Sequence, residues 1–164
     1  MDRSAAPAQV RGALGSSGPD ETRGIGRALG EASFPGTVLA LVGELGAGKT
    51  QLAKGVAEGL GVEGVVNSPT FVLMNEHPGR LRLFHADAYR LGEPEEALAA
   101  GLLDDREIDG VSVIEWADRL EGWLPVERLD VSILPGDGPD ERRIAWIAHG
   151  DRHGDLARRA LAAR

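Results

Sequence analysis

The sequence contains no cysteine, only two lysines, and few aromatic residues, which make up 4% of its 164 positions. Without cysteine it can form neither a disulfide framework nor a thiolate metal site. No apolar run approaches the roughly 20 residues of a membrane-spanning helix, and residues 1–20 contain no apolar segment of signal-peptide length. Positive charge is also scarce, since 18 basic and 26 acidic residues give a net charge of −8. We therefore expect a soluble cytoplasmic protein that does not hold nucleic acid through phosphate contacts of its own.

The length fits one domain with a proper core rather than two domains. Residues 1–19 are rich in Ala, Gly, Ser and Pro without sustained periodicity, so we predict a mobile N-terminal tail followed by a single domain over residues 20–164. Two apolar runs, Thr37–Val42 and Val111–Trp116, are typical of strands buried on both faces. Because such runs alternate with helices and hairpins, the pattern predicts an α/β fold with three layers around a mixed central sheet.

The remaining elements follow from local patterns. A helix from Lys49 to Leu60 is expected to end at Gly61. Trp123 and Trp146 are expected in the core. Further predicted elements are a first helix capped by Asp20 or Thr22 and running to about Glu31, a hairpin of Thr70–Glu76 with Leu81–His85, a closing antiparallel pair formed by LDVSIL and RRIAWIA, and a final helix over Asp155–Ala163.

The segment GELGAGKT, Gly43–Thr50, fits the phosphate-loop pattern G-x-x-x-x-G-K-[ST], with a buried strand before it and a helix after it. In that setting backbone N–H groups and the helix N-terminus face the phosphates, Lys49 reaches the β- and γ-phosphate oxygens, and the Thr50 hydroxyl binds magnesium. The chain thus has the elements of a P-loop NTPase-type fold. The candidate nucleotide-binding residues are Glu44, Leu45, Gly46, Ala47, Gly48, Lys49, Thr50 and Gln51.

Two carboxylates are candidates for the metal site beside Thr50. Glu115 closes the apolar strand VSVIE, and Asp87 follows LRLFHA, so both are predicted near strand ends. One of them could bind the metal while the other orients the attacking water. A surface cap or a salt bridge is the alternative for each.

Four further features bear on the site. Thr70, in the segment Ser68–Thr70, could sense the γ-phosphate, or the segment could be an ordinary turn. His85 is interpreted as a core or rim histidine rather than a catalytic one, and Trp116 could form a wall of the site. Between Glu93 and Asp109 there are seven acids and one arginine; a solvated face is favoured over a docking surface for a basic partner.

The motifs GELGAGKT, SPTF, HADAYRL and IEW occur in this order, and together they closely resemble the bacterial TsaE family, the ATPase of tRNA threonylcarbamoyladenosine biosynthesis. The resemblance spans about Asp20 to Ala148. It implies ATP and Mg²⁺ as cofactors, weak ATPase activity of the chain alone, and two protein partners, TsaD and TsaB, which transfer a threonylcarbamoyl group to the adenosine beside the anticodon. Contact with tRNA would be indirect, through the complex, and no membrane or DNA contact is implied.

The resemblance also implies roles for individual residues. Lys49 and Thr50 match the phosphate and magnesium positions, and Glu115 matches a metal ligand. Asp87 and Trp116 match functional positions of the second and third motifs. Thr22 falls where the first helix of the family approaches the nucleotide base, and Asp87, Glu115, Lys49 and Thr70 are the candidate catalytic residues.

Three rival functions are weighed against an ATPase. A small-molecule kinase shares the loop and the size, and Arg90 or Arg106 could serve in its lid. A GTPase is disfavoured because neither N-K-x-D nor T-K-x-D occurs in the chain. A non-hydrolysing module, in which ATP shapes a docking surface, belongs to a different class of function.

Overall fold

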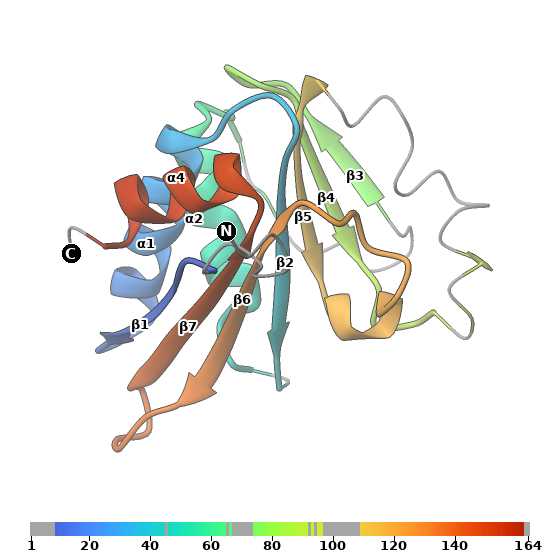
Figure 1. Ribbon diagram of the computed structural model, residues 1–164. Helices are drawn as coiled ribbons and strands as arrows, with labels where there is room; N and C mark the ends of the chain where they lie inside the picture. The colour runs from blue at the N-terminus through green and yellow to red at the C-terminus, as the bar shows by residue number, and fades with distance from the viewer. Residues whose placement is uncertain are drawn as a thin grey trace, which may run out of the picture.

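A computed structural model describes residues 9–44, 46–64, 66, 74–91, 93, 95–96 and 109–162. Its elements are β1 (Arg11–Ser16), α1 (Pro19–Ala32), β2 (Thr37–Gly43), α2 (Lys49–Gly59), β3 (Met74–His77), β4 (Leu83–Asp87), β5 (Val111–Glu115), the 3₁₀ helix η2 (Ala117–Leu120), β6 (Arg128–Pro135), β7 (Arg142–His149) and α4 (Asp151–Ala160). No helix among the described residues is long and apolar enough to cross a membrane. The predicted α/β class with a mixed central sheet is confirmed (Figure 1).

The seven strands form one sheet in the order β1-β7-β6-β2-β5-β4-β3. The central strands β6, β2, β5 and β4 run parallel to one another, while β7 pairs antiparallel with β6, β1 with β7, and β3 with β4. Leu41 is paired with Glu115, and Glu115 with Asp87. The carboxyl ends of β2, β5 and β4 therefore meet at one edge of the sheet, where ligands of open α/β sheets bind.

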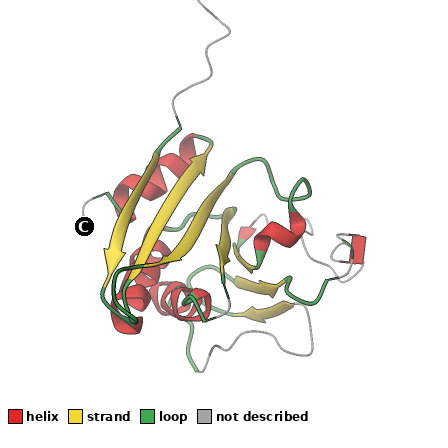
Figure 2. Cartoon of the chain, turned by 90° about the horizontal axis from the view of Figure 1, so that it is seen from below, coloured by secondary structure: helices red, strands yellow, loops and turns green. Residues whose placement is uncertain are grey.

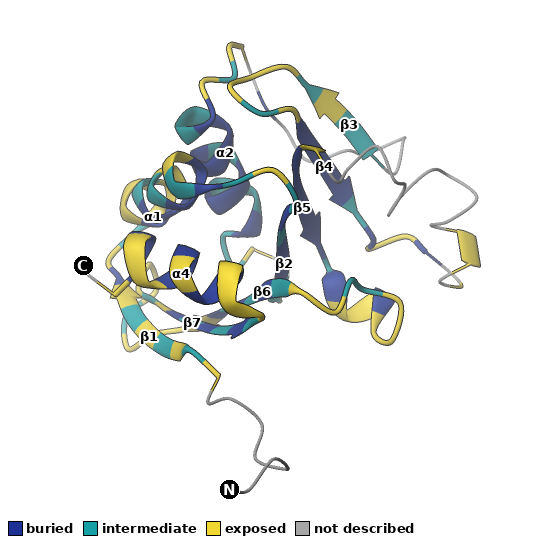
Figure 3. Cartoon of the chain, turned by 45° about the horizontal axis from the view of Figure 1, so that its top comes forward, coloured by how far each residue is buried: buried dark blue, intermediate teal, exposed yellow. Residues whose placement is uncertain are grey.

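The three long helices α1, α2 and α4 cover one face of the sheet (Figure 1). Side chains from these helices and from alternate strand positions form the larger core, in which Leu39, Leu52 and Val113 are completely buried. Strands β2, β4 and β5 are buried along most of their length (Figure 3), as the continuous apolar runs of β2 and β5 predict for those two strands. On α4 buried and exposed residues alternate with the helical period, because only one stripe of it faces the sheet.

The opposite face of the sheet carries a smaller apolar cluster that includes Ala40, Ala86 and Ile114. Ala117 and Leu120 of η2 pack on it, and the short helix lies apart from the three long ones (Figure 2). The two covering layers are thus unequal among the described residues.

Residues 11–16, which the sequence placed in a mobile tail, form β1 instead. This strand pairs with β7 from Arg11 opposite Ile147 to Ser16 opposite Arg142. The pairing depends on a glycine: a Cβ at Gly12 would lie 2.5 Å from the Trp146 ring, so only glycine lets the strand approach the indole this closely. The prediction of a tail over residues 1–19 is therefore wrong for this segment.

The first and last helices begin earlier than the sequence suggests. Helix α1 starts at Pro19 with Gly18 as N-cap, so neither Asp20 nor Thr22 caps it. Proline suits the first helical position because its φ is already helical and it has no N–H to leave unpaired. Helix α4 likewise begins at Asp151, one turn before the predicted start at Asp155.

The helix after the phosphate loop matches its prediction. Leu52, Val56 and Leu60 are fully buried, and Gly61 has a positive φ of 73° just after α2. The antiparallel pair of β6 and β7 is confirmed. Trp146 is buried, as predicted, whereas Trp123 is 42% exposed, so its assignment to the core is wrong.

Helices α1 and α2 approach each other through glycines. A Cβ at Gly26 would lie 2.1 Å from the Leu52 carbonyl oxygen, and one at Gly55 would lie 2.0 Å from the Arg23 carbonyl oxygen. The two helix backbones are therefore in direct contact. Because α2 begins with Lys49 and Thr50, this contact fixes the helix that carries both side chains.

Candidate nucleotide site

The phosphate loop connects β2 to α2 at the carboxyl edge of the sheet. Its curvature requires glycine at two positions, since Gly46 has φ 80° and Gly48, the N-cap of α2, has φ 115°. No side chain of the described residues caps α2, and no acid lies in its first turn. The positive end of this helix is therefore available to an anion.

The Lys49 side chain is directed back into the loop. Its Nζ donates to the carbonyl oxygens of Gly43, at 2.6 Å, and Glu44, at 2.8 Å. It also lies 4.0 Å from the centroid of the Trp116 ring. Lys49 is 5% exposed, and it forms no salt bridge with a carboxylate among the described residues. Burial lowers the pKa of its ammonium below the usual value, while the negative charges of Glu115, Asp87 and Asp118 oppose this shift.

Glu115 lies at the centre of the site with two hydrogen-bonding partners. The Thr50 hydroxyl donates to its Oε1 over 3.0 Å. Its Oε2 is 2.5 Å from Nε2 of His85. Because Glu115 is 2% exposed, these bonds satisfy a carboxylate that is almost entirely withdrawn from water.

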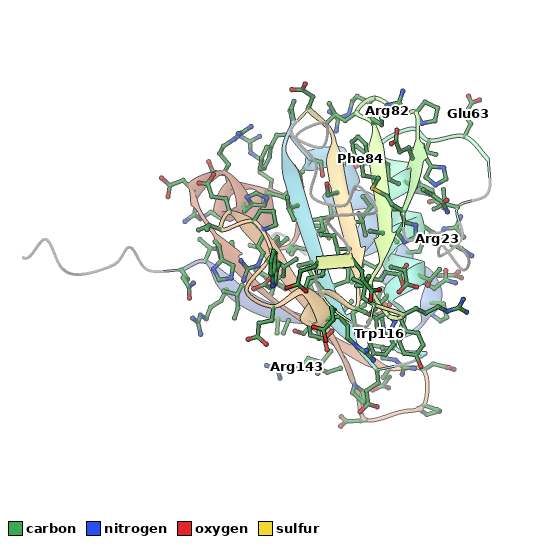
Figure 4. The ribbon with its side chains drawn as sticks, turned by 90° about the vertical axis from the view of Figure 1, so that its right-hand side faces the viewer. Arg23, Glu63, Arg82, Phe84, Trp116 and Arg143 are labelled. Atoms are coloured by element: carbon green, nitrogen blue, oxygen red, sulfur yellow. The ribbon has the colours of Figure 1, made fainter. Side chains whose placement is uncertain are left out.

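Asp87 and Trp116 complete the edge of the site. Asp87 is paired with Glu115 in the parallel register of β4 and β5, and its Oδ1 accepts a hydrogen bond from the Tyr89 N–H at 2.9 Å. Trp116 has φ 57°, the only positive φ of a non-glycine residue that the structure describes. The Tyr89 ring packs on it with centroids 4.8 Å apart. Figure 4 shows Trp116 at the end of the sheet remote from Arg82 and Phe84, which lie toward the start of β4.

A cavity of about 390 Å³ joins these elements. It is lined by Gly46, Ala47, Gly48, Lys49, Thr50, Gln51, Asp87, Glu115 and Trp116. A larger, open groove of about 750 Å³ runs between β1 and the turn from β6 to β7. Arg142 lies at the border of this groove and connects it to the loop, because its Nε donates to the Ala47 carbonyl oxygen over 3.1 Å.

The structure therefore brings together most of the predicted site. Thr22 lies close by, since its methyl group would be 3.7 Å from a Cβ at Gly48, and its hydroxyl shares a 2.7 Å hydrogen bond with Ser16. Glu44 is exposed, and it contributes to the site its backbone carbonyl oxygen, which accepts a hydrogen bond from Lys49. Three predicted features lie outside the described residues: Leu45, the segment Ser68–Phe71 with Thr70, and residues 97–108 of the acidic segment. The predictions made for them stay predictions.

Sequence reasoning missed two participants. His85 is fully buried, as a core histidine would be, yet its partner is the candidate metal ligand Glu115. The available signal was its position two residues before Asp87 on the same strand, which puts both side chains on one face. The contact of Arg142 with the loop had no signal in the sequence, because the two segments are 95 residues apart.

The residues fit a magnesium ion. The Thr50 hydroxyl and the Glu115 carboxylate lie within hydrogen-bonding distance, and Asp87 is the register neighbour of Glu115. Mg²⁺ prefers oxygen ligands of this kind and keeps several water and phosphate oxygens in its shell, so few protein ligands are needed. No group of three or more His, Asp or Glu residues that could hold a metal ion without other ligands occurs among the described residues.

The family model "Threonylcarbamoyl adenosine biosynthesis protein TsaE" matches residues 16–144. The chain belongs to the TsaE family. A TsaE protein of Bacillus subtilis (strain 168) is 44% identical over 136 residues, covering 82% of this chain and 84% of the relative. One from Streptomyces coelicolor is 42% identical over 136 residues, covering 79% and 92%.

The fold comparison agrees with this membership. The crystal structure of YdiB from Bacillus subtilis superposes with a TM-score of 0.77 and 36% sequence identity. The match covers 96% of this chain and 99% of that chain. The α/β architecture of this TsaE family member is therefore shared over nearly its whole length.

Proposed function

We propose that this protein binds and hydrolyses Mg-ATP in support of tRNA threonylcarbamoyladenosine biosynthesis, acting in a complex with TsaD and TsaB. One observation carries the proposal: the buried Lys49 ammonium donates to two loop carbonyl oxygens and, among the described residues, forms no salt bridge with a carboxylate. The next residue in the chain is Thr50, whose hydroxyl donates to Glu115. A buried cation held in this way favours an anionic ligand. The flanking helix N-terminus and the match to the TsaE family support the same function.

Each residue of the site has a distinct task in this proposal. Lys49 exchanges its carbonyl partners for phosphate oxygens, and the first turn of α2 donates backbone N–H groups. Thr50 and Glu115 hold the magnesium ion, which when bound neutralises charge on the transferred phosphoryl group. Asp87, beside Glu115 in the register, orients the water or adds a metal contact, and Trp116 covers Lys49 on one side. These groups bind and position the phosphate chain without any covalent step by the protein.

The first test is nucleotide binding, measured by titration with a fluorescent ATP analogue in the presence of Mg²⁺. Lys49→Ala is expected to weaken binding roughly 100-fold, because it removes a buried charge-assisted contact to phosphate. Lys54→Ala is the matched control: Lys54 is the other lysine of the chain, lies on the same helix, and does not line the cavity. Equal affinities of the two variants would contradict the assignment of the site.

The second test is phosphate release from Mg-ATP by the protein alone and with TsaD and TsaB. Strong stimulation by the partners that is lost in Lys49→Ala would support a partner-dependent ATPase. Complex formation without stimulation would instead favour a module in which ATP only shapes the docking surface. Transfer of the phosphate to a small acceptor would identify a kinase.

A further inference from the structure

Two side chains contact the Glu115 carboxylate, one at each oxygen, and only one of them belongs to the phosphate loop. Thr50 donates to Oε1 from α2, whereas His85 contacts Oε2 from β4. The proposed function uses Thr50 and Glu115 but assigns nothing to His85. The buried imidazole therefore needs an explanation of its own.

The sheet register explains how His85 reaches Glu115. In the parallel pair of β4 and β5, His85 lies opposite Val113 and Asp87 lies opposite Glu115. Alternate residues of a strand share a face, so His85 and Glu115 both lie on the face that the long helices cover. Leu83 and Val113, neighbours on that face, are completely buried, and His85 is also 0% exposed.

The chemistry of the contact determines its direction. An ionised carboxylate can only accept hydrogen bonds, so Nε2 of His85 carries the hydrogen and donates it to Oε2. The other ring nitrogen, Nδ1, is buried and has no hydrogen-bond partner among the described residues. Among the described residues, Glu115 is thus the one hydrogen-bond partner of this imidazole.

We propose that His85 is a positioning residue, which holds one oxygen of Glu115 so that the other is directed at Thr50 and the magnesium position. The proposal rests on the proposed function. When Thr50 turns its hydroxyl to the metal, Glu115 loses the donor on Oε1, and His85 remains as the partner that fixes the carboxylate. Partners of this kind orient metal ligands in proteins, and their loss lowers metal affinity by about 10–100-fold.

The test compares His85→Leu and His85→Gln with a control, His153→Gln. His153 is also a buried histidine bonded through Nε2, but it receives the Val38 N–H at the amino end of β2, whereas Glu115 ends β5 at the opposite edge. The measured quantity is the Mg²⁺ concentration at half-maximal binding of the fluorescent ATP analogue. Thermal unfolding of each nucleotide-free variant shows whether it is folded.

His85→Leu is expected to raise that Mg²⁺ midpoint about 10–100-fold while leaving the affinity measured without Mg²⁺ within about threefold of the wild type. His85→Gln, whose amide N–H can donate to Oε2, is expected to recover most of the loss, and His153→Gln to match the wild type. A folded His85→Leu variant with the wild-type midpoint would overturn the proposal. If only the glutamine variant folds, a midpoint raised in His85→Gln by the about 10–100-fold expected for His85→Leu would overturn the proposal equally, because the glutamine amide can still donate to Oε2.

A second readout does not depend on nucleotide. In NMR spectra of the ¹⁵N-labelled, nucleotide-free protein, the His85 Nε2–H proton is expected far downfield and protected from exchange, and this signal should be lost in Glu115→Ala. If the wild type bound no ATP analogue, the proposed function would fail, and the NMR signal would still decide whether His85 holds Glu115. An unchanged signal in Glu115→Ala would refute that contact.

Discussion

The contact between α1 and α2 leads to a sharp comparison of two glycines in one helix. A Cβ at Gly26 would lie 2.1 Å from the Leu52 carbonyl oxygen, while one at Gly24 would meet no atom within 4 Å. Both residues lie inside α1. Alanine at either position gains about 0.5–1 kcal/mol of helix propensity, so the two substitutions differ mainly in their effect on the neighbouring helix.

The size of the effect at Gly26 follows from the distance. Carbon and oxygen atoms in close contact are about 3.3 Å apart, so the helices must separate by about 1 Å to admit the methyl group. Overpacking of this kind costs about 1–3 kcal/mol, which leaves Gly26→Ala less stable than the wild type by up to about 2.5 kcal/mol after the gain in propensity. For a chain of this length the midpoint of thermal unfolding should fall by up to about 10 °C.

Urea unfolding and thermal melts of the two variants provide the assay, with ATP affinity as a second measurement. Gly24→Ala should be as stable as the wild type or more stable by up to about 1 kcal/mol. Gly26→Ala should also bind ATP more weakly, because the displaced α2 carries Lys49 and Thr50. If Gly26→Ala proved as stable as Gly24→Ala, the close approach of the two helices would be refuted.

Two further predictions concern stability. Burial, with smaller effects of the Arg152 and His149 charges, lowers the pKa of His153 from 6.5 to about 4. The fold favours the neutral form of His153, so the stability of the folded state that depends on this form is fully present above pH 6.5. It is lost as the pH falls toward 4, and the total loss is about 3 kcal/mol. In His153→Gln, the free energy of unfolding in urea should therefore depend less on pH between these values. Arg80 donates through Nη2 to three carbonyl oxygens at the end of α1, at 3.0–3.3 Å, and Arg80→Ala should cost about 1–2 kcal/mol in denaturant unfolding. The control Arg82→Ala removes only an exposed 3.7 Å ion pair and should change stability by less than about 0.5 kcal/mol; equal effects would argue against capping by Arg80.

The central part of the fold could be predicted because its signals are local. The apolar runs of β2 and β5 are continuous, and the loop pattern lies between a strand and a helix with a clear apolar stripe. The carboxylates at 87 and 115 were assigned to strand ends, and parallel pairing then brings them together. These features need no knowledge of distant contacts.

The missed features depend on distant partners. The glycine-containing strand β1 pairs with β7, where Gly12 lies against the ring of Trp146, more than 130 residues further along the chain. The sequence predicts a core or rim position for His85 but not its contact with Glu115, because neither composition nor spacing shows which strand lies beside β4. The large apolar ring of Trp123 predicts a core position, but the residue lies in the exposed turn after η2.

The two carbonyl bonds of Lys49 would compete with the nucleotide of the proposed function. In that function an incoming triphosphate would first displace the ammonium from Gly43 and Glu44, so part of its interaction energy would be offset by the bonds that are broken. The apparent affinity for the nucleotide would then be the intrinsic affinity multiplied by the fraction of molecules in which the lysine is already released. A nucleotide held under these conditions also departs more readily, because the loop re-forms its internal bonds as the ligand leaves. Such a site favours repeated exchange over long retention.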